Sequence, residues 1–181
     1  DYLNSLSNIS INLSDLGNYD KAKKYALKVL HQRKKTLGKE HPDYAISLNN
    51  IAAFCSYMRD YNKSLKMNLE ALEIYKKTIG KEHPSYALTL SNTAINYAEL
   101  GDHKSALFFL IHSSQIGIQS YSSNKFGLTP ALKASLKESV ELNYHYLASL
   151  SCINDSAIKN LHNVWIEING IIGSDQNRFR E

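Results

Sequence analysis

The stretch that decides the fold occurs twice, as "LGKEHPDYA" at residues 37–45 and as "IGKEHPSYA" at residues 79–87. The two copies start 42 residues apart and differ at only two of their nine positions. A loop that carries catalytic chemistry would explain such a recurrence. A corner that every unit of a repeated structure needs would explain it equally well. Aligning the whole chain with itself distinguishes these two explanations.

The match extends far beyond the nonapeptide when the chain is shifted by 42 residues. Three copies align without insertion or deletion, and a fixed period of this length is typical of a solenoid of stacked units. The aligned positions include Tyr2, Tyr44 and Tyr86; Leu6, Leu48 and Leu90; Asn8, Asn50 and Asn92; Ala22, Ser64 and Ala106; and Leu27, Leu69 and Ile111.

Each copy has the apolar spacing of two helices, because its apolar residues recur every three or four positions. In the second copy these are Ala45, Leu48, Ala52 and Cys55, followed by Leu65, Leu69, Leu72 and Ile79. Between the two helices, Gly17 and Gly101 in the outer copies can adopt positive φ at little cost, whereas the second copy has Arg59. The period-two alternation of strands is absent. The sequence therefore predicts an all-α chain of antiparallel helix pairs.

The duplicated corner then has a structural explanation. Gly38 and Gly80 are predicted to end the second helices of the first two copies, as C-terminal glycines do. Pro42 and Pro84 are predicted to begin the next first helices, where a missing N–H costs nothing. The intervening Lys, Glu and His recur because the corner recurs. We therefore expect no catalytic or metal-binding role for His41 or His83. No catalytic residue, metal ligand or cofactor is predicted for these 181 residues.

The composition, with 43% hydrophobic and 21% charged residues, is ordinary for a folded soluble protein. No run reaches the ~18 apolar residues of a membrane span, and no charged-then-apolar leader marks a signal peptide. Cys55 and Cys152 show neither a disulfide framework nor zinc spacing. Cys55 aligns with Leu13 and Tyr97, so we expect it to be a buried small hydrophobe. These features favour a cytoplasmic protein without membrane contact.

The net charge of +4 is mild. Basic residues are densest within residues 21–39, where they include Arg33. On a helix these charges spread over more than one face, which predicts a solvated surface. A nucleic-acid site would need a basic stripe with stacking aromatics or a known module. Neither is present in the sequence, so nucleic acid is not an expected partner.

The predicted units resemble tetratricopeptide repeats. The features they share are paired helices with small residues at fixed positions, a Gly in the turn within each pair and a Pro at the start of the next pair. The 42-residue period, with "LG-x-x-HP-x-x-A" and "LNNIA", is similar to the kinesin-light-chain type. This resemblance implies a right-handed α-solenoid with three repeats over residues 1–42, 43–84 and 85–120. It also implies binding to a protein or peptide, without enzymatic activity.

The repeat fades after residue 120. A polar connection over 120–130 and two further helical stripes predict a C-terminal helical pair within 121–181. The segment "VWIEINGIIGSDQNRFRE" at 164–181 is similar to the segment that joins such repeats to a caspase-like CHAT protease domain in bacterial proteins. This resemblance implies the sensing part of a larger protease, with its catalytic His and Cys beyond residue 181. The start at Asp1 instead of Met also suggests a fragment.

The first helix of each pair is expected to line the concave side of the superhelix. Asn8, Asn50 and Asn92 are predicted to point there, and each side chain offers both a donor and an acceptor to the backbone of an extended peptide. In the tetratricopeptide family matching asparagines hold peptide ligands, and the resemblance implies this role here. Adjacent faces of the first helices add the further candidates Asn49, Ile11, Ala53, Ile95 and Tyr57.

Three alternatives stay open at this point. The asparagines can simply solvate the groove or bond within their own helix. The module can be a scaffold that associates with itself through an open solenoid end. Finally, an enzyme would require Cys55 or Cys152 to lie within reach of a His.

Overall fold

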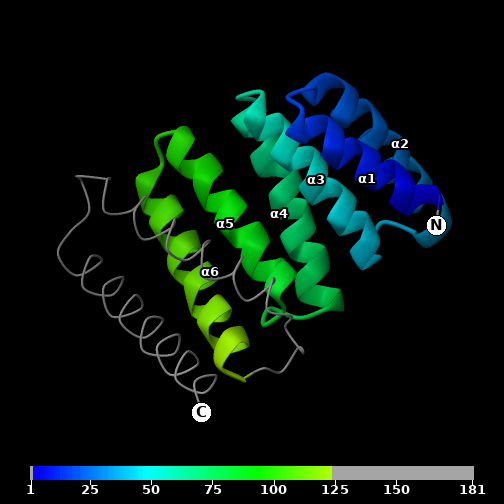
Figure 1. The fold of residues 1–181 in the computed structure, drawn as a ribbon. Helices are drawn as coiled ribbons and strands as arrows, with labels where there is room; N and C mark the ends of the chain where they lie inside the picture. Colours follow the sequence, from blue (N-terminus) through cyan, green and yellow to red (C-terminus); the bar gives the residue numbers. More distant parts are fainter. Residues whose placement is uncertain (1, 124–181) are drawn as a thin grey trace, which may run out of the picture.

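The computed structural model describes residues 2–123 as six α-helices joined by short turns (Figure 1). Within this range no residue is in a strand. The predicted C-terminal helical pair, together with Cys152, lies outside the described residues except for its first three positions. The helices are α1 Tyr2–Asp15, α2 Tyr19–Leu37, α3 Pro42–Tyr57, α4 Tyr61–Thr78, α5 Pro84–Glu99 and α6 His103–Ser123.

The helices form three antiparallel pairs, α1–α2, α3–α4 and α5–α6, which follow one another across the molecule (Figure 1). Each second helix also packs against the first helix of the next pair. Among residues 2–123, the first helices α1, α3 and α5 contact one another in turn, whereas the second helices make no such contacts. The first helices therefore line the inner, concave side. The chain is an all-α solenoid, as predicted.

The repeated corner between successive helix pairs, at residues 37–45 and 79–87, has the backbone conformation that the sequence predicts. Gly38 and Gly80 have φ of 84° and 85°, in the left-handed region that a Cβ disfavours. Pro42 and Pro84 are the first residues of α3 and α5. The predictions for these four residues are confirmed.

The histidines of the corner act as helix N-caps, a role that the sequence did not reveal. His41 has an extended backbone, and its Nδ1 accepts a hydrogen bond of 3.1 Å from the backbone N–H of Asp43. His83 does the same with the N–H of Ser85, also at 3.1 Å. The side chain thus satisfies one of the backbone donors that the start of a helix leaves unpaired. A capping role explains why His recurs at this position.

The turn within each pair also needs a left-handed residue. Gly17 and Gly101 have φ of 76° and 84°, and Arg59 is the one non-glycine residue with positive φ in the described part of the chain, at 61°. The next residue caps the second helix: the side chains of Asp60 and Asp102 each accept a hydrogen bond from a backbone N–H three residues later. The second repeat therefore keeps the turn despite the loss of its Gly.

The core follows most of the predicted positions. The register position held by Ala22, Ser64 and Ala106 is buried in all three copies, and the first-helix set in the second copy is buried throughout. The second-helix set was predicted less well, because Leu27 and Leu69 are exposed. In α4 the buried face instead runs through Asn68, Ala71, Leu72, Ile74 and Tyr75.

The prediction that Arg33 belongs to a solvated basic surface is wrong, because its side chain is only 5% exposed. Its Nη1 donates to the backbone oxygen of Asp43 at 3.0 Å and to Oγ of Ser47 at 2.9 Å, and its Nη2 donates to Oδ1 of Asn4 at 3.1 Å. Arg33 on α2 therefore connects α1 to α3. The first four residues of the expected polar connection at 120–130 are also helical, because α6 continues to Ser123.

Candidate functional site

A pocket of about 160 Å³ opens between α3, α4 and α5. Four of the eight sequence-predicted binding residues lie in its wall, together with three residues that were not among them. Because α3 and α5 are first helices, this pocket belongs to the concave side. The lining residues are Ala53, Ser56 and Tyr57 of α3, Ser64 and Asn68 of α4, and Asn92 and Ile95 of α5.

The wall of the pocket is neutral. It combines hydroxyl and carboxamide groups with the apolar surfaces of Ala53, Tyr57 and Ile95, and it contains no acidic or basic side chain. Tyr57 and Ile95 are exposed, so they offer apolar surface to a partner. The ring of Tyr57 is stacked on that of Tyr19 at a centroid distance of 5.2 Å. This contact with α2 holds one wall of the pocket in place.

Asparagines of successive repeats meet beside the pocket. Nδ2 of Asn92 donates to Oδ1 of Asn49 at 3.4 Å, and Nδ2 of Asn49 donates to Oγ1 of Thr89 at 3.1 Å. The amide of Asn49 therefore links α3 to α5. For Asn92 the sequence left three options open: contact with a ligand, solvation of the groove, or a bond within its own helix. The structure shows a bond between helices.

The other predicted site residues lie along the same inner helices without lining this pocket. Asn50 is half-buried on α3, and its spacing of three and seven from Ala53 and Tyr57 puts the three residues on one face of that helix. Asn8 and Ile11 are exposed on α1, in the first repeat. Contact of any of these residues with a partner stays a prediction.

Asn68 is one of the three lining residues that were not among the predicted binding residues. It is 1% exposed, lines the pocket from α4, and has no hydrogen-bond partner for either Nδ2 or Oδ1. The equivalent positions in the other repeats are Ala26 and Leu110, both buried. A polar residue where the register expects an apolar one was therefore the available signal, because buried polar groups are normally paired.

A second buried carboxamide lies next to the pocket wall. Nδ2 of Asn96 on α5 donates to Oγ of Ser64 at 2.8 Å, and its Oδ1 has no hydrogen-bond partner. Asn96 is fully buried. The interface between the second and third repeats is thus unusually polar, because Asn68 and Asn96 occur within one otherwise packed interior.

Of the two cysteines considered as nucleophiles, Cys55 lies among the described residues. This cysteine is fully buried, as predicted, and burial raises the pKa of its thiol, which disfavours the nucleophilic thiolate. Burial lowers the pKa of His83, which fits its use of Nδ1 as a hydrogen-bond acceptor. Among residues 2–123, no three His, Cys, Asp or Glu side chains come together as candidate metal ligands, and no helix is long and apolar enough to cross a bilayer.

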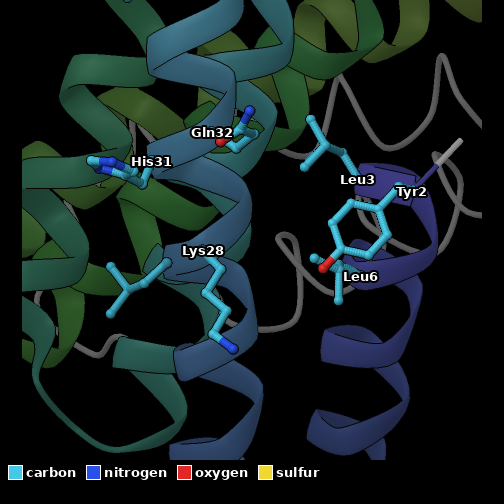
Figure 2. A pocket seen from close by; sticks show the side chains of 7 residues that line it. Tyr2, Leu3, Leu6, Lys28, His31 and Gln32 are labelled. Carbon is cyan, nitrogen blue, oxygen red and sulfur yellow. The ribbon is translucent and has the colours of Figure 1, made fainter.

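A larger groove of about 700 Å³ lies between α1 and α2 (Figure 2). Figure 2 shows Tyr2, Leu3 and Leu6 on α1 facing the side chains of α2 across it. Tyr2 is 74% exposed, whereas its equivalent Tyr44 is 5% exposed, because Tyr44 belongs to a cluster against which Leu30 of α2 packs. The groove is therefore a face of the first repeat that is buried in the second repeat, and no helix among residues 2–123 covers it. We assign the candidate site to the smaller pocket, where predicted residues from two repeats converge.

Three stacked helix pairs with a pocket on their concave side define a helical-repeat solenoid, the class of protein that presents an extended binding surface. The sequence profile described as "Tetratricopeptide repeat" matches residues 1–77 and 43–117. The chain belongs to the tetratricopeptide repeat family, which confirms the prediction from the 42-residue period. Repeats of this family generally mediate protein–protein interaction. No curated protein matches the chain.

Solved structures of similar fold include kinesin-light-chain-like proteins. BtubC (BKLC) from P. vanneervenii has a TM-score of 0.67 and 17% sequence identity, over 93% of this chain and 65% of that chain. This chain therefore spans 65% of the length of BtubC. A putative kinesin light chain from Podosopora anserina with nearly identical TPR-like repeats has a TM-score of 0.61 and 16% identity, over 97% of each chain. These likenesses confirm the kinesin-light-chain-like fold.

Proposed function

We propose that this chain binds an extended segment of a partner protein along its concave side, with one side chain of that segment seated in the pocket between α3, α4 and α5. The observation that carries this proposal is the pocket itself, which three helices of two repeats build on the inner side of the solenoid. Exposed Tyr57 and Ile95 at this pocket supply apolar contact surface.

The neutral lining defines the kind of segment that fits. A charged side chain in this pocket would lose its hydration without gaining an opposite charge, which is unfavourable. The lining also lacks the basic residues that would hold a terminal carboxylate. Asn50 lies on the same face of α3 as Ala53, three residues and ~4.5 Å away along the helix axis, so it is positioned to meet the backbone of a segment that continues along the groove.

Selection of peptides from a random-sequence library displayed on phage tests this proposal. The full chain is immobilised, and the selected peptides are titrated against two charge-introducing variants, Ile95→Glu and Leu69→Glu. Ile95 lines the pocket and is 40% exposed, whereas Leu69 is 36% exposed on the second helix α4 and is not a lining residue. We expect Ile95→Glu to weaken binding by roughly tenfold or more and Leu69→Glu to leave it unchanged. Equal effects of the two variants would exclude binding at this pocket.

Self-association is the competing proposal, favoured by the uncovered groove on α1 and α2. A second copy would have to present a helix to Tyr2 and its neighbours there, as α2 does to Tyr44 within the chain. Size-exclusion chromatography with light scattering separates the two proposals. A monomeric mass that does not change with concentration argues against self-association.

The sequence likeness of residues 164–181 supports a further proposal on the context of the chain, as the regulatory repeat part of a bacterial, cytoplasmic caspase-like CHAT protease. In that context segment binding would restrain or release a protease domain, and neither nucleic acid nor a membrane would be a partner. Reading the coding sequence past residue 181 tests the proposal. A downstream reading frame without a catalytic His and Cys would reject it.

A further inference from the structure

One residue in the lining of the concave pocket carries a buried carboxamide that the described fold does not use. Asn68 is 1% exposed, lines the pocket, and has no hydrogen-bond partner at either its amide nitrogen or its oxygen. Leaving such a group buried and unpaired destabilises a protein. The equivalent positions are occupied by buried Ala26 and Leu110, so the repeat does not require a polar residue there. Asn68 is thus a departure that packing alone does not explain.

The unused groups of Asn68 specify the chemistry of a complementary ligand. Nδ2 offers a donor and Oδ1 an acceptor, so a matching group must carry one acceptor and one donor side by side. An apolar side chain would leave both groups unpaired. A carboxylate or an ammonium would satisfy only one of them and would bury a charge in a wall without charged residues.

The volume and depth of the pocket indicate a side chain instead of a peptide backbone. A volume of about 160 Å³ is close to that of a cavity which holds one benzene molecule, ~150 Å³. A glutamine side chain has five heavy atoms beyond Cα, fewer than benzene, and therefore fits. Asn68 lies on α4, a second helix behind the inner layer formed by α3 and α5. For an extended segment whose backbone runs over α3 and α5, only a side chain would reach past them to Asn68.

We propose that this pocket is a subsite for a primary carboxamide side chain, that of Gln or Asn, which pairs with both polar groups of Asn68. The proposal rests on the proposed binding of a partner segment and names the residue that the segment places in the pocket. Exposed Ile95 and Tyr57 then contact the apolar stem of that side chain or its neighbours in the segment.

The experiment uses three small probes with the same number of heavy atoms that differ in hydrogen-bonding groups and in charge. The isotope-labelled full chain is titrated by NMR with propionamide, with propionate, and with methyl ethyl ketone. Propionamide has the donor and the acceptor, propionate is charged, and the ketone has only an acceptor. We expect propionamide to shift the side-chain amide signals of Asn68 in a saturable manner, with the other two probes at least roughly tenfold weaker.

Two variants assign this response to the carboxamide. Asn68→Ala copies Ala26 of the first repeat, so the fold should tolerate it, and it is expected to abolish saturation by propionamide. Asn62→Ala is the matched control, because Asn62 is exposed on the same helix, and it should leave the response unchanged. An equal response to all three probes, no response at Asn68, or an unchanged response in Asn68→Ala would overturn the subsite.

This result is separable from the proposed function. If displayed peptides bind in a manner that depends on Ile95 while the propionamide titration fails, the carboxamide subsite is wrong and segment binding stands. If propionamide saturates at Asn68 while no such peptide is found, the chemistry of the pocket stands and segment binding is wrong. If both experiments succeed, the selected peptides should share a Gln or Asn, and the Asn68→Ala variant should lose the preference for these residues.

Discussion

Replacing Asn68 with leucine is expected to stabilise the fold, although most buried substitutions destabilise proteins. The side chain of Asn68 is buried with neither polar group paired. Leu110, at the equivalent position of the third repeat, shows that leucine can be buried at this place in the repeat. The Asn68→Leu variant therefore removes an unsatisfied amide and adds apolar burial, because two methyl groups take the places of the amide oxygen and nitrogen. The adjacent pocket leaves room for their larger volume.

The magnitude follows from the loss of one unpaired amide. Protein mutational data place the burial of such a group at about 1–3 kcal/mol. Some crowding in the wall opposes the gain, so we expect the free energy of unfolding to rise by about 2 kcal/mol. For a chain of 181 residues this corresponds to an increase in Tm of about 4–8 °C. With an m-value of about 2 kcal/mol/M, the urea midpoint moves up by about 1 M.

Urea unfolding of the full chain, followed by far-UV circular dichroism, measures this shift. Asn62→Leu on the exposed side of the same helix is the control and should change the free energy of unfolding by less than about 0.5 kcal/mol. A midpoint for Asn68→Leu that is equal to or below that of the parent chain would refute the reasoning. It would mean that the amide of Asn68 gains favourable hydrogen bonds in the folded state.

Three further substitutions test the repeat itself. Arg33→Ala removes three hydrogen bonds from a buried guanidinium and should lower the free energy of unfolding by about 2–4 kcal/mol in urea titrations, whereas the neighbouring exposed Lys34→Ala should have almost no effect. Arg59→Gly should raise the free energy of unfolding by about 0.5–1 kcal/mol, because it relieves a left-handed backbone and glycine's own entropy offsets only part of that gain. Gly101→Arg should lower the free energy of unfolding. A Tm that moves in the same direction in both variants would contradict this view. Burial holds the pKa of His83 below that of the unfolded chain, so the unfolded state takes up a proton first and stability should fall as the pH drops below about 6.5. His83→Asn can still cap α5 without titrating, so its urea midpoint should depend less on pH; an unchanged pH dependence would assign the effect to other groups.

The period of 42 residues was sufficient to predict the helix pairs, because backbone requirements recur at fixed positions. Gly38 and Pro42 are local signals, since their conformational limits do not depend on tertiary contacts. Burial of Arg33 could not be read from its neighbours in the sequence, because its acceptors lie on α1 and on α3. The same holds for Leu69, whose exposure depends on how far α4 is rotated about its axis in the packed array.

The candidate site was only partly predictable for the same reason. Ala53, Asn92 and Ile95 follow from the helical spacing of the first helices, which determines their inner face. Asn68 comes from a second helix, and only the stacking of two repeats brings it into the wall of the pocket. A register comparison that searched for polar residues at apolar positions would have identified it.

The position of Arg33 across the first two repeats has a consequence for hydrogen exchange. Separating the α1–α2 hairpin from α3 would leave the guanidinium of Arg33 without two of its three acceptors, because Asp43 and Ser47 lie on α3. Amide protons of α1 and of the start of α3 should therefore become accessible to deuterium in one concerted opening, and the end of the array should not fray one helix at a time.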